Sequence, residues 1–175
     1  AAKTYGQVRI KSNDYWQYED DQGGSVKASR YTDSAERDPT AWSHLVVRVD
    51  TTQGTDSNRL RFYKNGQLMN TAGGNYPDQN ESLVINNNVT HAIGTLWRGS
   101  DNGGHWDGYM SQFIFCDGQS YDPTSFGSAN SDGVWTPITV PSVTYGSNGF
   151  KLMFTGTGAS ADANGLGADT SGNNN

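Results

Sequence analysis

One loop of ten residues, from Trp97 to Trp106, carries the side chains that a carbohydrate-binding site needs. Its two tryptophans offer flat apolar faces to a sugar ring, and polar groups beside them can hydrogen-bond to sugar hydroxyls. The polar residues concerned are Arg98, Asn102 and His105. Exposed apolar surface rimmed by polar groups marks a binding site. We therefore predict that this loop contacts glycan.

Oxygen-bearing side chains in and just after this loop suggest a second reading, a Ca²⁺ site. Asp101, Asn102 and Asp107 supply the hard oxygen ligands that Ca²⁺ prefers. Asp50 and Asp56 form a weaker alternative. The chain has no ligand loop of fixed spacing such as an EF-hand, and Asp107 precedes a glycine, as turn residues do. We therefore favour a turn role for Asp107 and expect that no cofactor is required.

Nucleophilic catalysis finds little support. The single cysteine, Cys116, lies in an apolar run and reads as a small core residue. No Gly-x-Ser-x-Gly motif occurs, and the three histidines, His44, His91 and His105, have no recognisable triad setting. We therefore predict a chain that is not an enzyme.

Short strands joined by many turns must position these residues, because apolar and polar residues alternate between clusters of Gly, Asn, Asp and Pro. The predicted strands are Gly6–Ile10, Asp14–Tyr18, Ser25–Tyr31, Ser43–Asp50, Arg59–Lys64, Gln67–Met69, Ser82–Ile85, Thr90–Leu96, Gly108–Cys116 and Gly149–Phe154. Asn65-Gly66 is the preferred pair for a type I′ turn, so it predicts a hairpin in which Tyr63 faces Leu68. The fold class is therefore all-β.

The length of 175 residues fits one domain with a two-layer core. We predict that residues 1–158 form this domain. Residues 159–175 are small and polar and read as a tail that leads into a further part of a longer protein. A short helical turn after Asp122 is expected between strands.

The aromatic residues outside the loop divide between core and surface. Trp42 and Trp135 are predicted to fill the core. Alternation places Trp16 and Tyr18 on one face of their strand and Tyr15 on the other.

Charge and hydropathy exclude two classes of partner. The formal charge is −6, and the 12 Lys and Arg residues are scattered singly, which argues against nucleic acid binding. No apolar run approaches the ~20 residues needed to cross a bilayer, so membrane insertion is not expected.

Four blocks of sequence resemble concanavalin A-like, laminin-G-like domains. Asp38–Thr52 is similar to their "D-P-x-A-W-x-H-hydrophobic run-D" segment. The other three, in the family's order, are Arg61–Gly66, His91–Gly94 and Trp106–Phe113. Later blocks resemble a subgroup found in structural and tail-fibre proteins of bacteriophages and marine viruses: Phe115–Gln119, Ser125–Gly127, Gly133–Pro137, Tyr145–Phe150 and Leu166–Asn173. Residues before Asp14 match this pattern least well.

The resemblance implies a two-sheet antiparallel jelly-roll sandwich, and in it Trp106 holds an aromatic position that packs. Retaining glucanases of this fold carry Glu-x-Asp-x-x-Glu on one strand, because glycosidic cleavage needs two facing carboxylates. The nearest match here is Glu19-Asp20-Asp21, but Gly24 stands where the third carboxylate would be. We interpret this acidic run as a solvated hairpin tip.

Together these features predict a non-catalytic virion structural or fibre-associated lectin-like domain that contacts cell-surface or extracellular glycan. It would lie on the virion surface or outside the cell, and fibres and shells are commonly homo-oligomers. An alternative is a purely architectural capsid or tail module that binds neighbouring virion proteins. A third reading is a polysaccharide-cleaving enzyme of the same fold.

Overall fold

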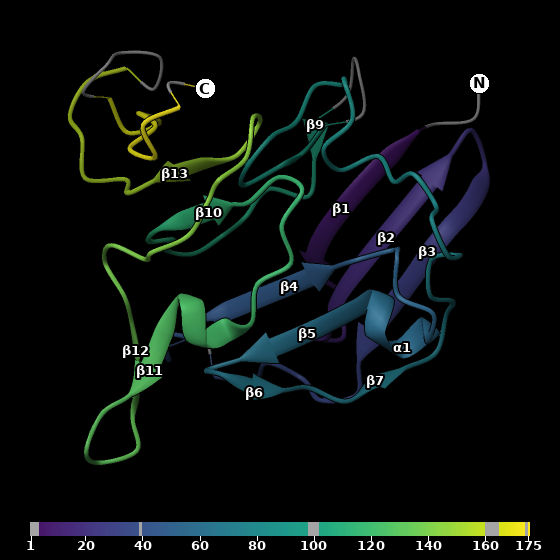
Figure 1. Cartoon of the computed structure of the whole chain (residues 1–175), viewed down its shortest axis with the longest axis horizontal. Coiled ribbons are helices and arrows are strands. Elements are labelled where there is room, and N and C mark those ends of the chain that lie inside the picture. The colour runs from purple at the N-terminus through teal and green to yellow at the C-terminus, as the bar shows by residue number, and fades with distance from the viewer. Residues whose placement is uncertain (1–3, 39, 98–101, 160–164, 174) are drawn as a thin grey trace. The chain divides into compact units, whose positions relative to one another are not determined.

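A computed structural model describes residues 4–38, 40–97, 102–159, 165–173 and 175 (Figure 1). Apart from one short α-helix and one 3-10 turn, the regular structure of these residues consists of strands, and their ladders are antiparallel. The all-β prediction is confirmed. No helix in the described ranges has the length and apolar character to span a bilayer.

The chain divides into two compact units. The first comprises Ala1–Trp106 and Asp122–Pro137, and the second comprises Asp107–Tyr121 and Ile138–Asn175.

The first sheet of the first unit has four strands in the order β1-β2-β3-β7. Their bounds are β1 Tyr5–Ile10, β2 Trp16–Gln22, β3 Ser25–Thr32 and β7 Thr71–Ala72. β2 runs four residues beyond the predicted end, so the β2–β3 turn falls at Gly23 and Gly24, whose φ angles are 66° and 91°. Glycine tolerates these positive angles without steric cost.

The second sheet contains β4 Leu45–Val49, β5 Leu60–Lys64 and β6 Gln67–Leu68 in that order, with α1 Asp56–Arg59 leading into β5. Asn65 and Gly66 both have positive φ, 48° and 79°, as a type I′ turn requires. Tyr63 pairs with Leu68. The predicted hairpin is confirmed.

The core of the first unit is formed by side chains from both sheets. Tyr18 and Ala28 come from the first sheet, and Leu60 and Phe62 come from the second. Partly buried apolar side chains extend this cluster: Trp16, Val47, Val49, Met69, Tyr76, Leu83 and Ile85. Trp16 and Tyr18 therefore share the inward face of β2, as alternation predicts.

Trp42 does not belong to this core, because its side chain is 68% exposed. It lies before β4 in a loop whose neighbours Ala41 and Ser43 are also exposed, so no ladder turns it inward. Trp135 is half-buried on β12 (Trp135–Pro137), which pairs with β11 (Gly127–Ala129). The predicted core role is wrong for Trp42.

The predicted turn after Asp122 is present as η1 (Pro123–Ser125), with Asp122 at its N-cap. The Asp122 side chain does not cap the turn. It forms an ion pair with Arg48 of β4 instead.

Several predicted strands are shorter than expected, and residues with positive φ interrupt two of them. Of the expected 90–96 strand, only Leu96 lies in a strand, as the first residue of β8 (Leu96–Trp97), which follows Gly94, whose φ is 80°. Gln112, at 59°, delays β10 to Phe113–Phe115, and β13 covers only Phe150–Leu152.

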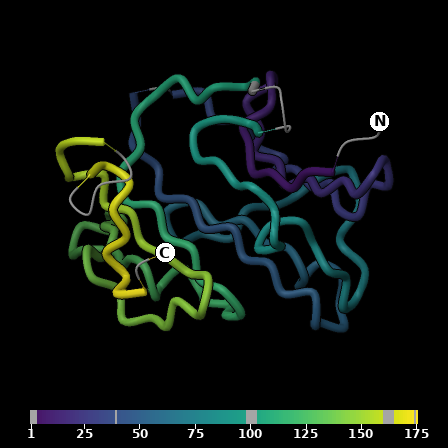
Figure 2. Tube along the Cα trace, turned by 90° about the horizontal axis from the view of Figure 1, so that it is seen from above, coloured from purple at the N-terminus to yellow at the C-terminus, as the bar shows by residue number. Residues whose placement is uncertain are grey.

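The second unit is built around the β10–β13 pair. Phe113 and Phe150 stack with ring centroids 5.8 Å apart. Figure 2 shows the C-terminal residues, in yellow, running back beside the segment that precedes them. Asp169 accepts backbone hydrogen bonds from Lys151 and Ser171, and the Asn173 side chain donates to the Gly149 carbonyl. Polar contacts rather than apolar burial therefore hold these C-terminal residues.

Candidate functional site

The predicted glycan loop lies on a short β-hairpin of the first unit. β8 pairs with β9 (Asn102–Gly103), which places Trp97 opposite Asn102. Arg98 falls outside the described residues. The Trp97 side chain is 39% exposed and His105 is exposed. The hairpin therefore presents one tryptophan surface to solvent at the start of the loop.

Trp106, at the other end of the loop, is anchored by the core. Its ring stacks on Trp16, with centroids 6.2 Å apart and planes at 21°. Its backbone N–H donates to the Gly94 carbonyl over 2.7 Å. Because 40% of the side chain still reaches solvent, Trp106 both packs and offers aromatic surface.

Of the three residues considered as Ca²⁺ ligands, only Asp107 has a described side chain. Asp101 lies outside the described residues, Asn102 is described only as part of β9, and Asp107 is exposed and belongs to the second unit. No group of three His, Cys, Asp or Glu side chains with the proximity for a metal ion occurs within the described ranges.

The acidic run Glu19-Asp20-Asp21 is not a solvated hairpin tip. Asp20 is 0% exposed, and its carboxylate accepts hydrogen bonds from the Val84 backbone N–H at 2.7 Å and from Gln22 Nε2 at 3.1 Å. Burial raises the pKa of Asp20, and the hydrogen bonds from Val84 and Gln22 offset this only in part. Asp20 is thus a core residue.

Glu19 lies on the opposite face of β2 from Asp20, since successive strand residues point to opposite sides. Its carboxylate accepts from Gln7 Nε2 at 2.7 Å and from Arg9 Nη2 at 3.1 Å. These two neighbouring carboxylates therefore do not face one another across a common site.

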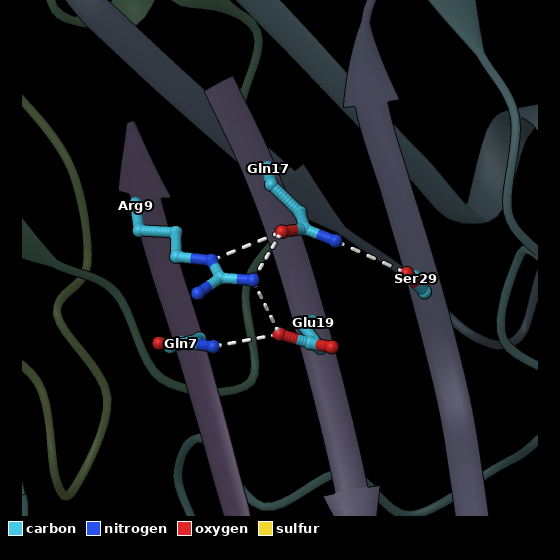
Figure 3. A network of polar contacts seen from close by, with 5 residues as sticks. All are labelled: Gln7, Arg9, Gln17, Glu19 and Ser29. Atoms are coloured by element: carbon cyan, nitrogen blue, oxygen red, sulfur yellow. Dashed lines mark hydrogen bonds and ion pairs between the residues drawn. The ribbon is translucent and has the colours of Figure 1, made fainter. Parts of the chain in front are cut away.

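A connected set of polar side chains covers this outer face, and the sequence interpretation did not identify it (Figure 3). We call it the polar face; its members are Gln7, Arg9, Gln17, Glu19 and Ser29. Gln17 Oε1 accepts two hydrogen bonds from Arg9, at 3.0 and 2.8 Å, and Gln17 Nε2 donates to Ser29 Oγ at 3.1 Å. On this face of the sheet, opposite Asp20, Gln7 and Gln17 are buried, with 8% and 5% exposure.

Two tyrosines extend the polar face at one end. Tyr31 of β3 pairs with Gln17, and its ring stacks against that of Tyr15 with centroids 6.3 Å apart. The ammonium group of Lys11 lies 4.3 Å from the Tyr31 ring centroid. The sequence signal was present as alternation: Gln7 and Arg9, and likewise Tyr15 and Gln17, are spaced two residues apart along a strand.

Of the histidines and the cysteine, His44 has a structural partner. His44 Nδ1 accepts the indole N–H of Trp135 at 3.0 Å, and burial lowers the pKa of His44. Burial raises the pKa of the Cys116 thiol to about 11, so it stays protonated at neutral pH and is a weak nucleophile. His91 is exposed.

Comparison with protein families, with curated proteins and with solved structures finds no match to this chain. Its function must therefore be inferred from the chemistry of the side chains described above.

Proposed function

We propose that this chain is a non-catalytic lectin-like domain of jelly-roll type, part of a virion structural or fibre protein, that binds cell-surface or extracellular glycan. The observation that carries the proposal is the half-exposed indole of Trp97 on the β8–β9 hairpin, with the part-exposed Trp106 at the far end of the same loop. A pyranose ring packs its apolar side on such a surface, and nearby polar groups fix its hydroxyls.

The anchoring of the loop supports this role. The Trp106 ring stacks on Trp16, which itself packs against the core, and the backbone of Trp97 pairs with β9. A site held on rigid elements loses less conformational entropy when a ligand binds. Sugar binding by an aromatic surface and hydrogen bonds needs no cofactor, so Ca²⁺ is not required by the proposal.

A glycan array probed with the purified chain tests the proposal, followed by the same array with Trp97→Ala. We expect binding to a restricted set of glycans, and a loss of that binding in the variant. The matched control is Trp42→Ala, which removes a more exposed tryptophan from a different loop and should leave binding unchanged. An array on which the unmodified chain binds no glycan would refute the proposal.

A second candidate function is architectural, as a module that binds other virion proteins or a second copy of itself. In the second unit Tyr109 is 88% exposed and Val140 is 75% exposed, and exposed apolar side chains of this kind suit protein contacts. Particle images would favour this role if the chain is packed between neighbours and the 97–106 loop is covered.

A further inference from the structure

We infer that the polar face of β1, β2 and β3 is the floor of a second saccharide site, one that takes a neutral, hydroxyl-rich sugar. This inference rests on the proposed glycan-binding function and adds a surface to it. The first argument is register: Arg9, Gln17 and Tyr31 lie in one row across the three strands, and Gln7, Glu19 and Ser29 lie in the next.

The two rows have the dimensions of a small ligand. Neighbouring strands are roughly 4.8 Å apart, and residues two apart along a strand are roughly 6.8 Å apart. The six side chains therefore cover an area roughly 10 Å by 7 Å, which one or two sugar rings can occupy.

The side chains of the polar face are held in place before any ligand arrives. Gln17 is bonded through both its amide atoms, to Arg9 on one side and to Ser29 on the other. Glu19 Oε2 accepts from both Gln7 and Arg9. Because these hydrogen bonds fix the side chains, little of their conformational entropy remains to be lost on binding.

Hydrogen-bonding capacity remains on the polar face after these contacts. Within the described residues, Gln7 Oε1, Glu19 Oε1 and Arg9 Nη1 take part in no hydrogen bond with the protein, and they are not among the side-chain atoms buried without a partner. Two of these atoms are acceptors and one is a donor. Sugar hydroxyls both donate and accept, so vicinal hydroxyls match this mixed set.

The charges of the polar face favour a neutral sugar over an acidic one. Arg9 and Glu19 form an ion pair at 3.1 Å, so the charges of the five polar-face residues balance. The ammonium group of Lys11 lies beyond them, against the Tyr31 ring. The stacked rings of Tyr15 and Tyr31 at the end of the first row supply aromatic surface for the apolar side of the sugar. Aromatic and polar groups are thus adjacent on one sheet.

Arg9→Met tests the inference, because it removes the hydrogen-bond donors and retains most of the aliphatic stem. Affinity for the best neutral glycan, measured by titration calorimetry, should fall by about tenfold or more, the loss expected for a hydrogen bond to a charged group. Arg61→Met is the matched control, since Arg61 lies on β5 and its side chain bonds to Ser57 and Asn58. This control should bind as the unmodified chain does.

Glu19→Gln is the second variant, because it keeps the size of the side chain and one acceptor oxygen. It should also weaken binding, and it decides the question if Arg9→Met does not fold. Thermal unfolding of each variant checks the fold. Variants that lose thermal stability but keep full affinity would show that the polar face only ties the strands together, and would overturn the inference.

The loop and the polar face are distinguished by their variants. Binding lost in Trp97→Ala but unchanged in Arg9→Met and Glu19→Gln would overturn this inference and leave the proposed function standing. Binding weakened in the polar-face variants supports the inference, whether or not Trp97→Ala also weakens it. If the unmodified chain binds no glycan, both the proposed function and the inference fail.

Discussion

The ring of Trp135 occupies space that two glycines leave open. A Cβ added at Gly66 would lie 2.3 Å from the ring, and one added at Gly127 would lie 2.5 Å from it. His44 completes the setting, because its ring stacks on Trp135 at 5.9 Å and accepts the indole N–H. The residues come from β5–β6, β11 and the start of β4, so this one ring joins three parts of the first unit.

Gly127→Ala should therefore destabilise the chain. The added methyl group must displace the Trp135 ring, and overpacking of this kind costs about 1–3 kcal/mol in the free energy of unfolding. Urea unfolding followed by circular dichroism measures the difference. Gly54→Ala is the control, because nothing lies within 4 Å of a Cβ at Gly54. Equal midpoints for the two variants would show that the ring moves aside without cost.

At the scale of elements, the Asp20 carboxylate binds the backbone of a segment that was expected to pair as a strand. Residues 82–85 were predicted as a strand, yet they join no sheet, and the Val84 N–H donates to the carboxylate of Asp20. Leu83 and Ile85 pack against the core beside it. Side chains of β2 therefore hold a segment that joins no strand ladder: Asp20 accepts from Val84, and Gln22 donates to the Ser82 carbonyl.

The raised pKa of Asp20 predicts a distinctive pH dependence. The pKa of this carboxyl is higher in the folded chain than in the unfolded chain. Its contribution to the free energy of unfolding is therefore largest below about pH 4, where the carboxyl is protonated in both states. The contribution is lost as the pH rises through the folded-state pKa. Asp20→Asn cannot ionise. The free energy of unfolding of this variant, relative to the unmodified chain, should therefore increase from about pH 4 upward and then level off.

Asp50→Asn provides a control of opposite sign, measured by urea unfolding between about pH 3 and 8. Hydrogen bonds from the Thr52 and Gln53 side chains lower the pKa of Asp50. Its contribution is present above the unfolded-state pKa of about 3.9 and is lost as pH falls further. The free energy of unfolding of Asp50→Asn should therefore lie below that of the unmodified chain at neutral pH, and this difference should become smaller as the pH falls. If the free energies of unfolding of Asp20→Asn and the unmodified chain differed by the same amount at every pH, ionisation of Asp20 would not be coupled to folding.

The contrast between the Asn65-Gly66 hairpin and Asp20 shows what the sequence could predict. The hairpin follows from two adjacent residues whose φ angles decide the turn, so local sequence sufficed. The burial of Asp20 depends on Val84, 64 residues away, and acidic neighbours beside Gly23-Gly24 resembled a solvated turn. Long-range partners of this kind leave no local pattern.

The candidate site shows the same division. Trp97, expected at the start of the loop, is the last residue of β8 and is 39% exposed, whereas the 68% exposure of Trp42 contradicts its expected place in the core. The polar face requires the register of three strands, and that register places Gln17 between Arg9 and Tyr31 and Glu19 between Gln7 and Ser29. Alternation in each strand was visible, but the pairing of the strands was not.

At the scale of the whole molecule, the two units have separate sets of stabilising contacts. The first depends on an apolar core, and the second depends on the phenylalanines of β10 and β13 together with the bonds around Asp169. Burial raises the pKa of Asp169, but hydrogen bonds from Lys151, Ser171 and Asn175 outweigh it and lower the pKa below the usual value. Asp169 therefore favours its ionised, hydrogen-bonded form.

Asp169→Ala should loosen the second unit alone. Amide hydrogen exchange, measured by mass spectrometry, should quicken in peptides covering 146–159 and 165–173, because the N–H groups of Lys151 and Ser171 lose their acceptor. Peptides from β2 and β5 should keep their protection. Thr157→Ala, at an exposed position of the same unit, is the control. Faster exchange throughout the chain would instead show that the two units unfold together.

Strand β1 forms one end of the order β1-β2-β3-β7, and within the described residues it pairs with β2 alone. Such a strand offers its outward backbone groups as a template on which another chain can add a strand, the first step of aggregation. Arg9 projects from this strand with 41% of its side chain exposed, and a charged group there discourages a second β1 from aligning alongside it. We therefore expect a second role for Arg9, because a charged side chain on an edge strand disfavours the addition of another strand.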